Sequence, residues 1–198
     1  MRAFDSSRLP RPHIEFNLQQ LAQHTHLDLE IGAGQGFHAV QYCRANPARH
    51  LLAVERTHQR FAKLLHRKTH HPELRNLSVL HADAVAFVTH YLPDRCLDRV
   101  FLLYPNPYPK KSQANLRWHK SPFIAMLKQK MKLGAELELA TNIESYATDA
   151  QSEFVDVWNM PLIQACEVQV GAPPRTHFEK KYLLRGDRCW NLIFQNPL

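Results

Sequence analysis

The stretch Asp28-Leu-Glu-Ile-Gly-Ala-Gly-Gln-Gly36 decides how this chain of 198 residues folds. Its first half continues a short apolar run that starts at Leu27, as a buried strand does. Gly32, Gly34 and Gly36 then make a G-x-G-x-G turn that opens a helix. Glycines at such a turn let the backbone approach a ligand closely. A tight turn without a ligand is the alternative interpretation of the glycines alone.

Around this stretch, short runs rich in Leu, Ile and Val alternate with longer segments of helical period, which is typical of a parallel sheet covered by helices. Strands are predicted at Leu27 to Ile31, Leu51 to Glu55, Leu77 to His81, Leu97 to Leu103 and Glu136 to Thr141. Helices are predicted at Phe37 to Ala45, Thr57 to Lys68, Ala84 to Tyr91 and Pro122 to Met131. Helix ends are expected at Asn46-Pro47, His71-Pro72 and Leu133-Gly134. Cys189 to Gln195 is a further strand candidate that could lie antiparallel on the sheet edge.

Composition places the chain among ordinary globular proteins. With 44% hydrophobic and 22% charged residues, we expect a single domain over residues 1–198. The formal charge of +7 favours a polyanionic partner. The four cysteines form no C-x-x-C pair, and neither a signal peptide nor a membrane-spanning run is apparent. We therefore expect reduced thiols, a cytoplasmic location and no membrane partner.

Acidic side chains at successive strand ends predict the ligand of the glycine turn. Glu55 ends the second strand about twenty residues on, where a carboxylate can accept hydrogen bonds from both ribose hydroxyls. Asp83, after the third strand, could accept from an adenine amino group or simply cap the next helix. Glu30 would place negative charge near a cationic sulfonium and would suit a pyrophosphate poorly. This charge favours S-adenosylmethionine over NAD, whose fingerprint also spaces its glycines differently.

A proline-rich stretch, Leu103-Tyr-Pro-Asn-Pro-Tyr-Pro-Lys-Lys111, follows the fourth strand. Three prolines within five residues make a rigid, non-helical loop whose polar and aromatic side chains are held in place. Four basic residues would border the mouth of the site and bind phosphates: Lys110, Lys111, Arg117 and Lys120. The alternative is a stiff connector with a solvated basic rim.

These motifs together resemble the bacterial tRNA (guanine-N7)-methyltransferase family, over roughly Leu27 to Phe194. Leu-Glu-Ile-Gly-Ala-Gly34, Val-Glu55 and Ala-Asp-Ala84 are similar to the family's cofactor motifs, and the proline loop is similar to its Pro-Asp-Pro-Trp-x-Lys-Lys stretch. Leu139-Ala-Thr-Asn142 with Tyr146 resembles its Ala-Thr-Asp segment, and Arg175-Thr-His-Phe-Glu179 with Arg185-Gly186 resembles its closing signature.

The resemblance implies an α/β, Rossmann-like fold with a mostly parallel seven-stranded sheet, helices on both faces and an antiparallel C-terminal strand. It implies S-adenosylmethionine as cofactor, tRNA as partner and 7-methylguanosine at position 46 of the variable loop as product. Implied cofactor-binding residues are Glu30, Gly32, Gly34, Glu55, Asp83, Ala84 and Asn106, of which Asn106 is also the catalytic residue. Implied substrate-binding residues are Lys110, Asn142, Thr176, His177, Phe178 and Glu179.

The chain departs from the family motifs at four positions. Asn106 and Asn142 stand where the family has aspartates, Tyr108 replaces a Trp, and His177 replaces a Lys. A carboxylate could accept both the N1 and N2 protons of guanine, whereas an asparagine offers one acceptor oxygen. Asn106-Pro107-Tyr108 also resembles the Asn-Pro-Pro-Tyr motif of enzymes that methylate exocyclic amines of bases. A catalytically weak module that binds cofactor or tRNA is the other alternative.

Neither the histidine-rich segment nor the N-terminal segment is expected to carry chemistry. His66, His70 and His71 lie among basic residues without nearby carboxylates, so we expect a solvated helix face and no metal site. Residues 1–26, with a helix at Asn17 to Gln23, should cover the sheet or the cofactor pocket. Monomer and homodimer are both compatible with the sequence.

Overall fold

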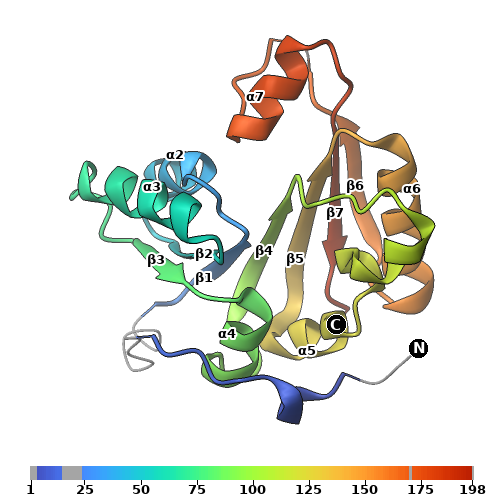
Figure 1. The fold of residues 1–198 in the computed structure, drawn as a ribbon, viewed down its shortest axis with the longest axis horizontal. Coiled ribbons are helices and arrows are strands. Elements are labelled where there is room, and N and C mark those ends of the chain that lie inside the picture. Colours follow the sequence, from blue (N-terminus) through green and yellow to red (C-terminus); the bar gives the residue numbers. More distant parts are fainter. Residues whose placement is uncertain (1–3, 15–23, 170, 198) are drawn as a thin grey trace.

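The computed structural model describes residues 4–14, 24–169 and 171–197, which include a seven-stranded sheet of order β3-β2-β1-β4-β5-β7-β6 (Figure 1). Neighbours among β1 to β5 are parallel, and β7 runs antiparallel to both β5 and β6. The strands are β1 (Leu27–Ile31), β2 (His50–Glu55), β3 (Leu77–His81), β4 (Leu97–Leu103), β5 (Met131–Thr141), β6 (Leu162–Glu167) and β7 (Trp190–Gln195).

Helices cover the two faces of this sheet. They are α2 (Phe37–Ala45), α3 (His58–Thr69), α4 (Ala84–Tyr91), α5 (Phe123–Lys130), α6 (Glu144–Ser152) and α7 (His177–Leu184), with short 3-10 helices η1 (Ser6–Arg8), η2 (Lys111–Leu116) and η3 (Trp118–Lys120) and a π-helical turn η4 (Glu153–Val157). Successive residues of a strand point to opposite faces. Accordingly, Leu51 of β2 packs in one core with α2 and α3, whereas its neighbour Leu52 packs in the other with α4, α5 and α6.

The predicted fold and most predicted elements are confirmed. The strands β1, β3 and β4 and the helices α2 and α4 begin and end at the predicted residues. The strands β2 and β7 differ from the prediction by one residue at the start, and α3 and α5 differ by one residue at each end. The strand β5 begins at Met131, five residues before the predicted Glu136. In these strands and in α4 and α5 most apolar residues are buried, so their periodicity is clear in the sequence, whereas α3 buries only Leu64. The helix expected at Asn17 to Gln23 lies outside the described residues.

Two expectations about the second half are wrong. Leu133-Gly134 does not end a helix, because α5 already ends at Lys130 and β5 begins at Met131. Gly134, with φ 78°, lies where the pairing of β4 with β5 shifts register, so this glycine serves a bulge. The C-terminal strand is antiparallel but not at the edge, since β6 pairs with its outer side. All residues of β6 except Leu162 are exposed, so the sequence shows no apolar run there.

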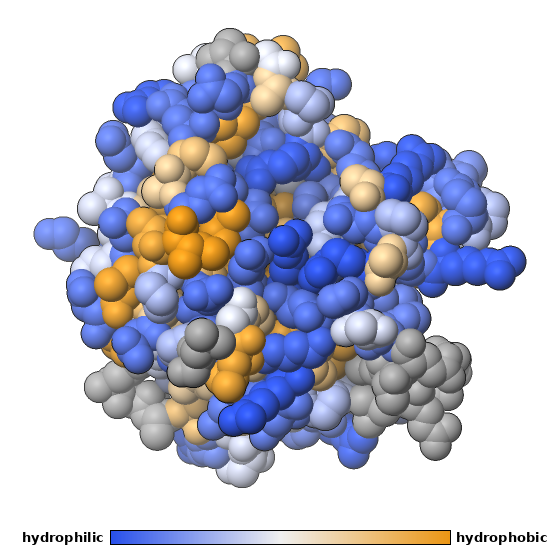
Figure 2. All heavy atoms as spheres, turned by 180° about the vertical axis from the view of Figure 1, so that it is seen from behind, coloured by the Kyte–Doolittle hydropathy of each residue, from blue (hydrophilic) through white to orange (hydrophobic). Residues whose placement is uncertain are grey.

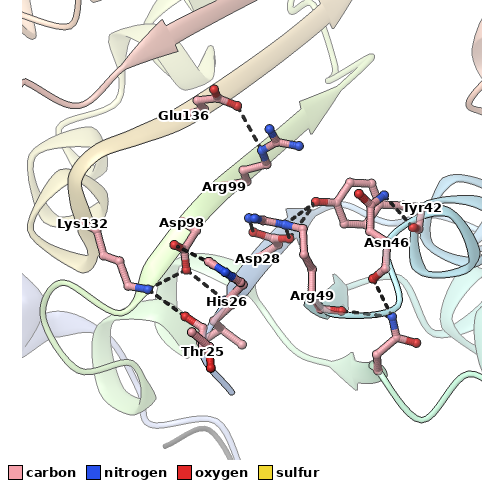
Figure 3. A network of polar contacts seen from close by, with 12 residues as sticks. Thr25, His26, Asp28, Tyr42, Asn46, Arg49, Asp98, Arg99, Lys132 and Glu136 are labelled. Carbon is pink, nitrogen blue, oxygen red and sulfur yellow. Dashed lines mark hydrogen bonds and ion pairs between the residues drawn. The ribbon is translucent and has the colours of Figure 1, made fainter. Parts of the chain in front are cut away.

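A buried ion pair ties the first strand to the helix that follows it (Figure 3). The carboxylate of Asp28 is fully buried and accepts from Arg49 Nε at 2.7 Å and from the Tyr42 hydroxyl at 2.7 Å. Because the group is buried with its partners in place, removing one of them would leave a costly unpaired charge. This acidic residue of the opening stretch is therefore structural, and it fixes α2 and the start of β2 against β1.

Seen from behind, hydrophilic side chains cover most of the surface, and apolar ones gather on the side where β6 and β7 lie (Figure 2). Within the described ranges, none of the helices is both long and apolar enough to cross a bilayer.

Candidate active site

The carboxyl ends of β1, β2, β3 and β4 meet at one pocket of about 650 Å³. Open α/β sheets bind ligands at this edge. All residues predicted to bind the cofactor line the pocket: Glu30, Gly32, Gly34, Glu55, Asp83, Ala84 and Asn106. From the predicted substrate set, the lining includes Thr176, His177 and Phe178. Lys110, Asn142 and Glu179 are outside it.

The glycine turn forms the floor of the pocket between β1 and α2. Gly32, Gly34 and Gly36 have φ values of 77°, 59° and 76°, a region that residues with a Cβ rarely adopt. At Gly36 a Cβ would also lie 2.3 Å from Cδ1 of Leu64 in α3. The turn thus requires glycine both for its backbone and for the close packing of α3 against it.

Glu55 is oriented by the backbone around it. Its side chain is buried, with one oxygen accepting from the Gly34 amide at 2.9 Å and the other from the Thr57 amide at 2.7 Å. A carboxylate oxygen has two lone pairs, so each can still accept a further hydrogen bond. The arrangement leaves Glu55 able to accept from a pair of hydroxyl groups in the pocket.

Glu30 carries a buried oxygen without a hydrogen-bond partner. The residue is 3% exposed, and its Oε2 lies 3.1 Å from Nδ1 of His38 without the geometry of a hydrogen bond. A buried polar atom that lacks a partner is costly and is a candidate for ligand binding. Since Glu30 lines the pocket, a cationic or hydrogen-bond-donating ligand would satisfy this oxygen.

Asp83 caps α4, which is one of the two roles that the sequence suggested for it. Its Oδ1 accepts from the amides of Val85 and Ala86 at 2.9 and 3.2 Å, and its Oδ2 lies 3.6 Å from Nη1 of Arg56. The capping role leaves an adenine contact through the second oxygen as a prediction.

The proline loop after β4 is strained and held at both ends. Tyr104 and Tyr108 have φ values of 51° and 44°, unusual for non-glycine residues. Such strain persists only where surrounding contacts over-determine it. Between them, Asn106 lines the pocket and its Oδ1 accepts from the Tyr108 amide at 3.3 Å.

One end of the loop is held by α7. The Tyr104 hydroxyl donates to Glu179 at 2.6 Å, and Glu179 is fully buried. Arg175 donates to the same carboxylate from its amide at 2.8 Å and from Nη2 at 2.8 Å. Burial alone would raise the pKa of Glu179, but the hydrogen bonds from Arg175 lower it below its ordinary value. Glu179 is therefore an ionised structural residue here.

The other end is held by Arg117. Its Nε donates to the Pro107 carbonyl at 3.1 Å and its Nη2 to the Tyr108 carbonyl at 3.2 Å, while Nη1 donates to Asp149 of α6 at 2.9 Å. Asp149 also lies 2.9 Å from His119 and 2.9 Å from Lys120. Burial opposes ionisation of Asp149, yet the hydrogen bonds from Lys120 and His119 prevail and lower its pKa to about 2.

Comparison with known proteins identifies the family. Residues 24–192 match the family model described as a putative methyltransferase. The tRNA (guanine-N(7)-)-methyltransferase of Hyphomonas neptunium is 34% identical over 154 residues, covering 78% of this chain and 69% of that protein. The chain belongs to the bacterial tRNA (guanine-N7)-methyltransferase family. Its relative of the same name from Nitrosospira multiformis is 32% identical over 174 residues, 84% of this chain and 73% of that protein.

Solved structures confirm the Rossmann-like methyltransferase fold of this family member. The 16S rRNA methyltransferase KamB superimposes with a TM-score of 0.68 at 18% identity, over 98% of this chain and 99% of that one. Precorrin-6y C5,15-methyltransferase of Geobacter metallireducens gives a TM-score of 0.61 at 15% identity, over 98% and 97%.

The remaining predicted residues of this tRNA (guanine-N7)-methyltransferase homologue lie around the pocket rather than in it. Lys110 is exposed at the start of η2. Asn142 donates from Nδ2 to Asp187 at 3.0 Å, so the structure does not bring it together with Asn106 in the pocket lining. In the described part of the chain, no group of three or more His, Cys, Asp or Glu side chains could hold a metal ion.

In this methyltransferase, two basic residues differ from the expectation drawn from the sequence, and one pocket residue was not assigned from it. Arg117 and Lys120 were expected to bind phosphates, but their cationic groups pair with Asp149 and, for Lys120, also with Glu153. In this structure both charges are balanced within the protein, so they are less available to phosphate than the sequence suggested. Arg60 of α3 lines the pocket, and the only sequence signal for this is its position near the start of the helix that follows Glu55.

Proposed function

We propose that this protein transfers the methyl group of S-adenosylmethionine to N7 of a guanine in tRNA. The observation that carries the proposal is a single pocket in which the unpaired oxygen of Glu30 and the oriented carboxylate of Glu55 lie beside the proline loop with Asn106. The names of relatives that cover most of the chain support the same activity.

The pocket residues fit the cofactor by charge and by hydrogen-bonding capacity. When bound, S-adenosylmethionine supplies an electrophilic methyl group on a cationic sulfonium. Glu30 would satisfy its unpaired buried oxygen with the positively charged end of the cofactor, and Glu55 would accept from the ribose hydroxyls. Asp83 remains the candidate for the adenine amino group through its Oδ2.

Methyl transfer to guanine needs positioning more than proton transfer. N7 carries a lone pair and no proton at neutral pH, so no strong general base is required, and orientation supplies the rate enhancement. The proline loop is held by Tyr104 and Arg117, which keeps Asn106 at the pocket wall. Phe178, 37% exposed at the pocket, offers a ring on which a base can stack.

The finer assignments follow from the family. We propose position 46 of the tRNA variable loop as the methylated guanosine, with Thr176, His177 and Phe178 contacting it, and the cytoplasm as the place of action. The net charge of +7 suits a polyanionic substrate. Lys110 and Lys111, both exposed, remain the predicted phosphate contacts of the proline loop.

Single-turnover transfer of labelled methyl to unmodified tRNA tests the proposal. We expect 7-methylguanosine in the wild-type reaction, mapped by cleavage at the methylated base, and its loss when guanosine 46 is replaced by adenosine. Methyl on an exocyclic amine would instead favour the Asn-Pro-Tyr alternative. Binding of cofactor and tRNA without any transfer would favour a non-catalytic binding module.

A further inference from the structure

Helix α3 carries an unbalanced positive charge at the mouth of the pocket. Its 12 residues include four Lys or Arg and no Asp or Glu. Arg60, Lys63 and Arg67 follow one another at spacings of three and four residues, so they share one face of the helix, and together they are called the α3 stripe. Of the residues of α3, only Leu64 is buried.

The α3 stripe is fixed beside the cofactor turn. Leu64 packs against Gly36, and Nε of Arg67 donates to the Gln35 carbonyl at 2.9 Å. Arg60 lines the pocket, and its guanidinium lies 5.9 Å from the ring centre of Phe178 in α7. The stripe therefore runs along α3 beside the pocket, with Arg60 in the lining and Arg67 hydrogen-bonded to the lining residue Gln35.

Within the described part of the protein, no carboxylate balances the charges of the stripe. Arg60 and Lys63 are exposed, and neither forms an ion pair with any described carboxylate. By contrast, Arg117 and Lys120 on the other side of the pocket are neutralised by Asp149 and Glu153. A positively charged helix face near the site that no internal carboxylate balances is suited to an external anion.

We infer that the α3 stripe binds the phosphate backbone of tRNA beside the nucleotide that enters the pocket. The inference rests on the proposed function and places a second contact surface opposite Lys110 and Lys111. Each phosphate that a Lys or Arg neutralises releases condensed counterions, which makes binding weaken with salt. Phe178 would then be free to stack on the base while Arg60 turns to the adjoining phosphate.

The test compares two double variants that each remove two positive charges. Arg60→Gln/Lys63→Gln changes the stripe but spares Arg67, whose bond to Gln35 supports the cofactor turn. Arg75→Gln/Arg95→Gln is the matched control, since both residues are exposed and precede β3 and β4 at the opposite end of the sheet. The Kd for unmodified tRNA is measured from low to high salt, with calorimetric binding of S-adenosylmethionine as a check on folding.

We expect the stripe variant to bind tRNA at least tenfold more weakly at low salt. The slope of log affinity against log salt should become shallower by roughly 1.5, because each lost phosphate contact removes about 0.7 to 0.9. The control should keep the wild-type slope. Equal slopes in both variants would overturn the inference while leaving the proposed function intact. A wild type that neither binds nor methylates tRNA would instead refute the proposed function. If the stripe variant loses cofactor binding, the single variant Lys63→Glu replaces it in the test, because Lys63 lies outside the pocket lining. A salt dependence of tRNA binding equal to that of the wild type would then overturn the inference.

Discussion

The hydroxyl group of Tyr104 donates a 2.6 Å hydrogen bond to Glu179, which lies 75 residues further along the chain. The bond joins the start of the proline loop to α7, and both segments contribute residues to the pocket lining. Burial and the nearby Glu179 carboxylate raise the pKa of Tyr104, so its hydroxyl remains protonated and donates. The strained backbone of Tyr104 is thus fixed by its own side chain.

Tyr104→Phe should lower both stability and turnover. The variant removes a donor to a buried carboxylate, and hydrogen bonds to charged groups contribute about 2 kcal/mol. We expect that loss in the free energy of unfolding by denaturant, together with a lower kcat, because the loop carrying Asn106 is less well held. Tyr182→Phe is the control, since the Tyr182 ring lies 5.5 Å from that of Tyr104. An equal loss in the control would show that the effect is not specific to the hydrogen bond between the Tyr104 hydroxyl and Glu179.

Asp149→Asn should slow methyl transfer without abolishing cofactor binding. The change leaves Arg117, His119 and Lys120 without their shared anion, so the carbonyl contacts of Arg117 to the proline loop weaken. We expect kcat to fall at least fivefold while the KM for S-adenosylmethionine changes little. Asp156→Asn, which removes an exposed carboxylate from the neighbouring η4, should behave as wild type. A rise in KM alone would contradict a positioning role.

Stability should fall as the solution is acidified, through His50. This histidine is 6% exposed, and burial, with His24 and Lys68 nearby, lowers its pKa from 6.5 to about 4. The folded state favours the neutral imidazole, whereas the unfolded chain binds a proton below pH 6.5. The free energy of unfolding is therefore unaffected by this histidine above pH 6.5 and decreases as the pH falls towards 4. The full effect is roughly 3 kcal/mol. Denaturant unfolding of wild type and His50→Gln between pH 7 and 4 should show a shallower decline in the variant, and parallel declines would refute the assignment.

Removal of the charge should affect tRNA binding at Lys110 and stability at Lys120. Lys110→Ala/Lys111→Ala should reduce the salt dependence of tRNA binding, because both side chains are exposed. Lys120→Ala should leave that dependence unchanged and lower stability instead, since Lys120 pairs with Asp149 and Glu153. Titrations of tRNA binding at several salt concentrations distinguish the two effects. A reduced slope for Lys120→Ala would mean that its internal pairing gives way when RNA binds.

Periodicity made the sheet and the pocket predictable, whereas long-range polar contacts were not. Leu29 and Val100 lie in apolar runs that are buried, so their strands are evident in the sequence. The position of Arg117 depends on backbone carbonyls and on Asp149, 32 residues away, and no local pattern reports such a contact. For the same reason Glu179 resembled a substrate residue in sequence but is buried, with a hydrogen bond from Tyr104, 75 residues away.

The structure separates the effects of restoring the two family aspartates. Asn106→Asp keeps an oxygen that can accept from the Tyr108 amide, so the loop turn should persist while the pocket gains an acceptor-only group. If it recovers 1 to 2 kcal/mol of transition-state stabilisation, guanine-N7 transfer rises about five- to thirtyfold. Single-turnover rates with unmodified tRNA measure this. A drop in rate would show that the asparagine amide itself is the working group.

Asn142→Asp should act in the opposite direction. Nδ2 of Asn142 donates to Asp187 at 3.0 Å, and a carboxylate at that place would repel the Asp187 carboxylate instead. We expect lower stability and no gain in rate from this variant alone, and recovery in Asn142→Asp/Asp187→Asn, which exchanges donor and acceptor. Because Asn142 is not in the pocket lining with Asn106, the rate effects of the two restorations should add rather than couple. Strong coupling between Asn106→Asp and the exchanged pair in single-turnover transfer would mean that both side chains meet the same guanine once tRNA is bound.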